Sequence, residues 1–200
     1  MTRREAIQHA SLVLGYAISA PAIGAVLNGC KAAPDLAFKP IFFSKEQAVL
    51  VSELSEIILP KTTTPGAKDA GVPGFIDSLL GEVYSQEDRN KFINGLSEFD
   101  AEAEKTYGNK FVDCDHEEQI SLFKKHHDEA ITKSAGDGPT GWWNSGAGAD
   151  KPFVMKIKEL TILGFFTSEL GATKVLQYNQ VPGPFQGCVP LTQVGKAWAT

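Results

Sequence analysis

The three cysteines are the residues of this chain with the widest choice of chemistry, because a thiol can carry a lipid, pair in a disulfide or ligate a metal ion. They are Cys30, Cys114 and Cys188, and their number is odd. No Cys-x-x-Cys-His sequence occurs, which excludes covalent attachment of haem c to this chain. An odd count gives one cysteine a role of its own, and the residues before Cys30 indicate that role.

Cys30 follows Leu-Asn-Gly at residues 27–29, a sequence similar to the lipobox in front of a lipidated cysteine. Further upstream, Arg3 and Arg4 precede a mostly apolar stretch that is shorter than the roughly 20 residues of a spanning helix. This pattern predicts an export signal over residues 1–29 that resembles the twin-arginine type, which carries folded cargo. Cleavage would leave Cys30 as the lipid-bearing N-terminus. A buried N-terminal helix and an uncleaved signal kept in a complex are the alternatives.

If Cys30 takes a lipid, Cys114 and Cys188 remain as a pair. Export places them in an oxidising compartment, where disulfides persist. They stand 74 positions apart, and closing a loop of that size contributes on the order of 4 kcal/mol in the chain-entropy model. The sequence therefore predicts a disulfide between Cys114 and Cys188, with two free thiols as the alternative.

Two adjacent histidines, His126 and His127, stand in a polar run that continues with Asp128 and Glu129. Successive residues of a helix point about 100° apart, so the two imidazoles cannot both face one metal ion without distortion. The pattern predicts a solvated helix face and no metal site. An independent enzyme that uses residues 126–129 is the weakest functional hypothesis, because neither a nucleophile elbow nor a nucleotide-binding glycine loop accompanies them. No catalytic residue is expected in this chain.

Length and composition describe the scaffold that must position these residues. The chain has 200 residues, of which 42% are hydrophobic and 22% charged, as in one soluble globular domain. Its net charge of −5 argues against nucleic acid as a partner, since a polyanion-binding surface carries a basic excess. The 19 glycines and 11 prolines exceed average usage and predict long ordered loops.

Helical periodicity dominates the chain after residue 43. Apolar residues at helical spacing, capping residues and helix-breaking prolines predict five helices. These follow Ser44, span Phe75 to Val83, follow Ser85, follow Asp115 and run from Phe153 to Leu170. The predicted fold class is all-α, a compact bundle of about five helices with long ordered Pro/Gly-rich loops and an extended C-terminal tail. Residues 30–43 are expected to be a tether, and residues 44–200 a single helical domain.

Rigid loops and aromatic side chains are the features most typical of a binding surface. Pro60, Pro65 and Pro73 restrict the backbone after the first helix, and this loop is either a docking surface or a plain connector. The helix that begins at Phe153 is apolar on more than one face, so it is central or lies at a subunit interface. The aromatic candidates for a partner interface, each with core packing as the alternative, are Trp142, Trp143, Phe165, Phe166 and Phe185.

Two segments carry a resemblance to a known family. The first is IILPKTTTPGA at residues 57–67, continued by AGVP at 70–73 and FID at 75–77. The second begins with ELT at 159–161 and continues through GFFTSELGA at 164–172 to VPGP at 181–184 and GCVPL at 187–191. Together they resemble the gluconate 2-dehydrogenase subunit 3 family, over nearly the whole chain after the signal. The leader is similar too, although Glu5 and Ala6 follow the arginines in place of the more usual apolar pair.

The resemblance implies a small, non-catalytic subunit of a membrane-bound, flavin-dependent sugar dehydrogenase. In such complexes a large flavoprotein of the glucose–methanol–choline type carries FAD and the catalytic residues, and a haem c protein often accepts the electrons. The small subunit helps the large one to mature and supplies its export signal. No cofactor is therefore expected in this chain itself.

The expected function is that of an accessory subunit that assists folding, twin-arginine export and membrane attachment of the flavoprotein. Its expected partners are the flavoprotein, a c-type cytochrome, the twin-arginine translocation machinery and, through the lipid anchor or the signal segment, the membrane. The expected location is the periplasm, attached to the membrane. The alternative is a stand-alone exported lipoprotein that binds a ligand or a component of the cell envelope.

Overall fold

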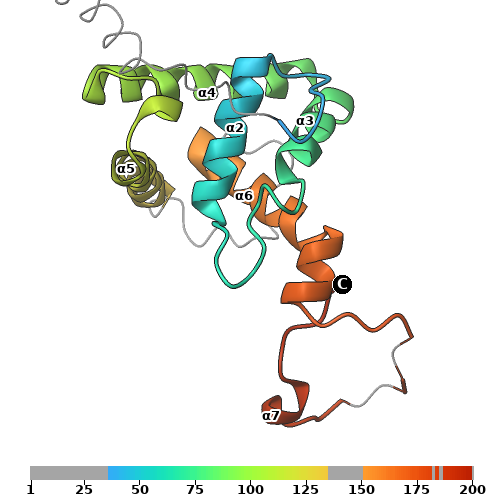
Figure 1. The fold of residues 1–200 in the computed structure, drawn as a ribbon. Coiled ribbons are helices and arrows are strands. Elements are labelled where there is room, and N and C mark those ends of the chain that lie inside the picture. Colours follow the sequence, from blue (N-terminus) through green and yellow to red (C-terminus); the bar gives the residue numbers. More distant parts are fainter. Residues whose placement is uncertain (1–35, 135–150, 182, 185–186, 200) are drawn as a thin grey trace, which may run out of the picture. The chain divides into compact units, whose positions relative to one another are not determined.

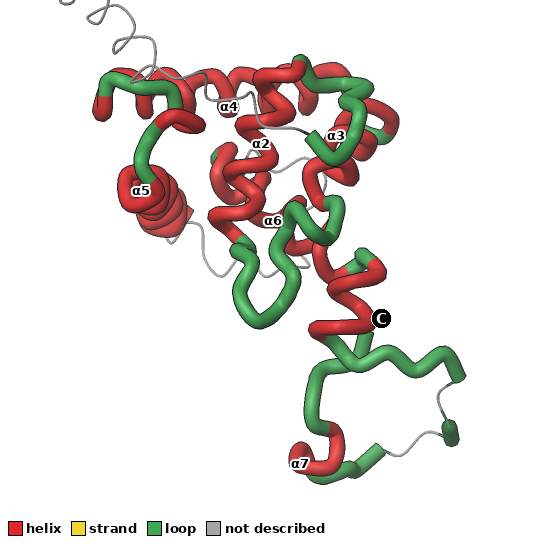
Figure 2. Tube along the Cα trace, viewed as in Figure 1, coloured by secondary structure: helices red, strands yellow, loops and turns green. Residues whose placement is uncertain are grey.

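The structure is a computed structural model that describes residues 36–134, 151–181, 183–184 and 187–199. Within these residues the fold is helical and contains no strand, which confirms the predicted all-α class (Figure 2). The predicted leader, Trp142, Trp143 and Phe185 lie outside the described residues. The elements are α2 (Lys45–Ile58), α3 (Val72–Glu82), α4 (Gln86–Tyr107), η1 (Phe111–Asp113), α5 (His116–Ser134), α6 (Phe153–Phe166), η3 (Gly171–Val175) and α7 (Leu191–Val194).

The ends of the helices follow the capping chemistry of the sequence. Ser44 and Gln47 form a complete capping box at the start of α2, in which each side chain accepts a hydrogen bond from the other residue's backbone N–H. Ser85 accepts the Asp88 amide at the start of α4. At the other end of α4, Gly108 has a φ of 76°, the left-handed conformation that favours glycine after a helix. The predicted starts of these helices are therefore confirmed.

Helix α6 is the central element of the described body. It contacts α2, α3, α4 and α5, and Figure 1 shows it passing beside α2 and α3. Gly164 allows a close contact with α3, because a Cβ atom built there would lie 2.6 Å from the ring of Phe75. The predicted alternative of a central helix is thus the observed one, and the all-round apolar composition of α6 follows from packing on several sides.

Helix α6 ends at Phe166, four residues earlier than predicted. The Ser168 hydroxyl donates to the carbonyl of Phe165 at 2.6 Å and accepts the Gly171 amide at 3.0 Å. Such local bonds compete with the helical ladder. A separate turn with π-helical bonding, η3, follows.

The N-terminal strap, residues 36–43, packs on the helical body, in contrast to the tether expected over residues 30–43. Phe43 is 5% exposed and belongs to the core, and Phe38 and Phe42 pack against it. The ring of Phe43 packs at a tilt against that of Phe92 on α4, with ring centres 6.0 Å apart. The predicted tether is therefore wrong for residues 36–43, because a short segment with proline and no periodicity resembles a linker even where long-range contacts fix it.

After η3, backbone hydrogen bonds join residue 177 to residues 197 and 199 near the C-terminus. The backbone N–H of residue 177 donates to the carbonyl of Ala197 at 2.8 Å, and its carbonyl accepts the Ala199 amide at 2.7 Å. Among the described residues of the segment after η3, three large hydrophobic side chains remain exposed: Tyr178, Val181 and Trp198. Among the described helices, none combines the length and the apolar character that crossing a membrane requires.

Candidate partner interface

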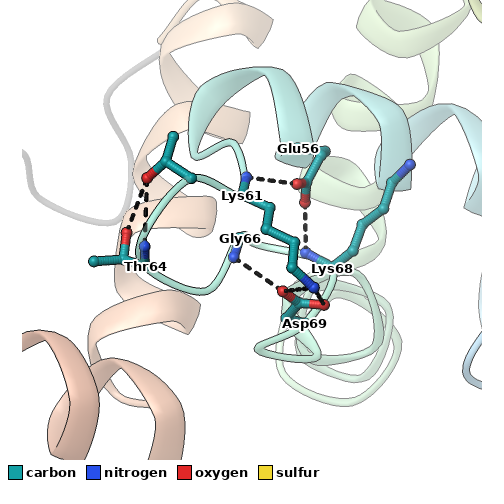
Figure 3. Close-up of polar contacts among 7 residues, drawn as sticks. Glu56, Lys61, Thr64, Gly66, Lys68 and Asp69 are labelled. Atoms are coloured by element: carbon teal, nitrogen blue, oxygen red, sulfur yellow. Dashed lines mark hydrogen bonds and ion pairs between the residues drawn. The ribbon is translucent and has the colours of Figure 1, made fainter.

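The loop from residue 59 to residue 71, called the connecting loop, joins α2 to α3 and is held by the carboxylate of Glu56 (Figure 3). Oε1 accepts the backbone N–H of Lys61 at 2.8 Å, and Oε2 accepts the backbone N–H of Lys68 at 2.9 Å. The two arms are also joined directly, because the Ala67 amide donates to the carbonyl of Leu59 at 2.9 Å. One side chain at the end of α2 therefore fixes both arms of the loop.

A second carboxylate, that of Asp69, fixes the loop from inside. It pairs with the Lys61 ammonium at 2.9 Å and accepts the Gly66 amide at 3.4 Å. The hydrogen bond from Lys61, followed by that from Gly66, holds the pKa of Asp69 below its ordinary value. Lys68 is also paired, through its ammonium to Glu53 at 2.8 Å. Both lysines of the loop are thus neutralised locally.

Gly66 is buried where the two arms of the loop come together. A Cβ atom built there would lie 2.7 Å from the backbone nitrogen of Lys61 and would collide with the Glu56 carboxylate. Only a residue without a side chain allows Glu56 to reach both arms, so this glycine serves a close approach of backbone to carboxylate.

The tip of the connecting loop keeps its side chains in solvent. Pro60 and residues 61–64 are exposed, Pro65 is half-buried, and Pro73 is buried at the start of α3. Of the three candidate prolines, Pro73 is therefore not available on the surface. The prolines alone do not order this loop, because the carboxylates of Glu56 and Asp69 hold its backbone. The alternation of acidic residues and lysines around a Thr/Gly run is the sequence signal for these contacts.

The two aromatic candidates on α6, Phe165 and Phe166, differ in their exposure to solvent. Phe165 is 3% exposed and belongs to the core, so it is not available to a partner, whereas Phe166 is 37% exposed. Leu163, one turn earlier, is 40% exposed. Successive helical residues point in different directions, so Phe166 faces outward while its neighbour Phe165 faces the core.

The adjacent histidines are partly buried, so the predicted solvated helix face is wrong for them. His126 Nε2 lies 3.0 Å from a Glu102 carboxylate oxygen, which ties α5 to α4. His127 Nε2 lies 2.7 Å from the Lys158 ammonium, which ties α5 to α6. Glu102 also binds Lys125, and this hydrogen bond holds the pKa of Glu102 below its ordinary value and raises that of Lys125. The contacts of these polar residues join neighbouring helices, and they do not form a catalytic arrangement within the described residues.

Both described cysteines are free thiols, so the disulfide predicted between them is not formed in the structure. Cys114 is buried, and its thiol donates toward the carbonyls of Asn109 and Lys110, while Cys188 is exposed. Burial, together with the nearby carboxylate of Glu118, raises the pKa of the Cys114 thiol. No group of three or more metal-ligating side chains occurs within the part of the chain that the structure describes.

The described residues thus define a helical protein with an ordered, exposed loop and no gathered set of reactive groups. The model of the gluconate 2-dehydrogenase subunit 3 family matches residues 45–183. The chain belongs to this family and so to the small subunits of gluconate dehydrogenase complexes. No curated protein and no solved structure shows a significant match to it.

Proposed function

We propose that the chain is the non-catalytic small subunit of a periplasmic, FAD-dependent sugar or polyol dehydrogenase complex. It assists the folding of the flavoprotein catalytic subunit, accompanies it through the twin-arginine route and keeps it at the membrane. Membership of the family supports the association with a catalytic complex. The observation that carries the proposal is the connecting loop, which is ordered by its own polar contacts while its tip stays exposed.

Each part of the chain has a separate task in this proposal. Arg3 and Arg4 direct the pair to the export machinery, and Cys30 takes the lipid that anchors it. FAD and the catalytic residues belong to the partner, and a c-type haem belongs to a further subunit that accepts electrons. The helical body serves as the binding partner, with the connecting loop and the exposed face at Phe166 as its contact surfaces.

An ordered loop suits this task because little conformational entropy is lost when it binds. Its tip carries three threonines and Pro60, and the Lys61 charge is balanced by Asp69. Such a surface offers hydroxyl groups and methyl groups without a net charge. It therefore fits the neutral backbone and side chains of another protein better than a charged ligand.

Co-purification tests the association. Thr63→Arg places a long charged side chain at the exposed tip, and Thr106→Arg makes the same change at an exposed position of α4. With a C-terminal tag on this chain, we expect wild type and Thr106→Arg to retain the flavoprotein, detected by flavin absorbance. Thr63→Arg is expected to weaken binding by at least roughly tenfold. Absence of any flavoprotein with wild type would reject the proposed function itself.

Replacement of Arg3 and Arg4 by lysine tests the export role. If the flavoprotein travels as a passenger, both proteins accumulate in the cytoplasm of the variant. Fractionation followed by quantification of both subunits gives the answer. Normal export of the flavoprotein beside a retained small subunit would contradict the passenger mechanism, while leaving the association untouched.

A further inference from the structure

One face of α3 is shaped to receive the N-terminal strap. Gly74, Asp77 and Gly81 follow each other at spacings of three and four, so they share one side of the helix. A Cβ atom built at Gly74 would lie 3.3 Å from the ring of Phe38, and one built at Gly81 would lie 3.2 Å from Cβ of Phe42. Two glycines thus let the strap approach the helix backbone on either side of Asp77.

Asp77 binds the strap through its backbone. The side chain is buried at 1% exposure, and its Oδ2 accepts the amide of Ile41 at 2.7 Å. Its Oδ1 accepts the amides of Phe42 and Phe43 at 3.1 and 2.8 Å. Three consecutive N–H donors on one carboxylate satisfy both the buried charge and a stretch of backbone that has no helical partner.

The receptor for the strap is complete only when α3 and α4 are assembled. Arg89 of α4 donates to the carbonyl of Gly81 at 2.7 Å and to that of Tyr84 at 2.9 Å, and it lies over the ring of Phe42 at 5.8 Å. Phe92 of α4 packs against Phe43. The strap therefore touches residues of two helices at once, and both of these helices pack against α6.

We infer that the Gly74–Asp77–Gly81 face is an intramolecular binding site for residues 36–43, with Asp77 as the positioning residue. Because docking requires the packed helices, a docked strap indicates that the body that follows the leader is folded. Insofar as it concerns export, this inference rests on the proposed function. While the strap is docked, the body holds the chain from residue 36 onward. Release of the strap frees eight residues, which span up to roughly 28 Å when extended.

Asp77→Asn is the decisive variant, because the amide keeps the shape of the carboxylate but replaces one acceptor oxygen by a donor. Either orientation of the amide sets an NH2 group against at least one strap amide. We expect the amides of residues 41–43 to exchange with deuterium at least roughly tenfold faster, while the amides of α6 keep their protection. Glu98→Gln, the same chemical change at an exposed position of α4, is the matched control.

Gly81→Leu is a second variant that keeps Asp77. Leucine favours the helix over glycine, so an effect on α3 alone would stabilise the chain. The leucine side chain would occupy the space that Phe42 fills and would displace the strap. Faster deuterium exchange at the amides of residues 41–43 is therefore expected in this variant too. Unchanged exchange there in both variants would overturn the binding site. If Asp77→Asn unfolds the whole chain, Gly81→Leu decides alone.

Export of the full chain with its partner gives the second readout. Release of the strap is expected to lower the exported fraction at least severalfold in Asp77→Asn and Gly81→Leu relative to Glu98→Gln. Faster strap exchange with unchanged export would mean that export does not depend on docking of the strap, and the binding site would still stand. Failure of the wild-type leader to export either protein would reject the proposed function, and the exchange result would still stand.

Discussion

The N-terminal strap and the connecting loop are two non-helical, proline-containing segments that differ in where their side chains lie. The strap directs its aromatic side chains inward and gives its backbone to the buried Asp77. The connecting loop gives its backbone to Glu56 and Asp69, and its tip stays exposed. In both, a carboxylate from a helix collects backbone N–H groups.

The difference shows where such a segment can act. A segment that buries its side chains becomes part of the core and reports the state of the fold. A segment whose tip is held by bonds at its base keeps the side chains of that tip free for another molecule. An ordered segment outside the helices can therefore serve either as part of the core or as a binding surface in this protein. Whether its side chains are buried or exposed distinguishes the two roles.

The largest expected effect lies in the strap. Phe43→Ala removes a buried ring and should lower the free energy of unfolding by about 3–5 kcal/mol, as measured by urea denaturation. Ile41→Ala in the strap and Thr63→Ala in the loop tip, both at exposed positions, should change it by no more than about 0.5 kcal/mol. A cost for Phe43→Ala near that of the two controls would mean that the strap is not part of the core.

A smaller effect is expected at the base of the connecting loop. Gly66→Ala forces the new methyl group against Lys61 and Glu56, and should cost about 1–3 kcal/mol in urea denaturation. Gly183→Ala, where nothing lies within 4 Å of the added atom, is the matched control and should be nearly neutral. Equal costs for the two would show that Glu56 does not hold the loop as closely as described.

The smallest effect concerns the charge of Asp69. Its pKa lies below the ordinary value of 3.8, so its contribution to stability is present above that pH and is lost as the pH falls through the lowered pKa. Asp69→Asn should therefore loosen the loop slightly at neutral pH, and the difference from wild type should vanish in acid. The NMR signal of the Gly66 amide should titrate below pH 3.8 in wild type and stay constant in the variant. A midpoint at or above 3.8 would contradict the bond to Lys61.

The helices were predictable because their signals are local. Ser44, Ser85 and Gly108 mark helix ends within a few residues of the apolar periodicity that they bound. The site of the strap was not predictable, because Asp77 acts on amides 34 to 36 residues away. Nothing in the residues next to Asp77 distinguishes a buried acceptor from an exposed acid on a helix.

The interface candidates show the same limit. Helix α6 is apolar on several sides, so its periodicity does not choose between Phe165, which is buried, and Phe166, which is exposed. His126 and His127 look like surface residues by composition and are drawn inward by Glu102 and Lys158 on other helices. In each case the deciding contact comes from a distant part of the chain.

The central position of α6 has a consequence for the order of events during synthesis. This helix packs on α2, α3, α4 and α5, yet it is made after all of them. Roughly 130 residues separate the start of the strap from the end of α6, and at the usual pace of translation they take about 6–26 s to synthesise. Throughout that time the first 35 residues are already made, while the body behind them lacks its central helix. The strap docks on α3 and α4, and α6 packs against both of these helices. Docking therefore becomes secure only after the last long helix of the body has been made, and it marks the end of that interval.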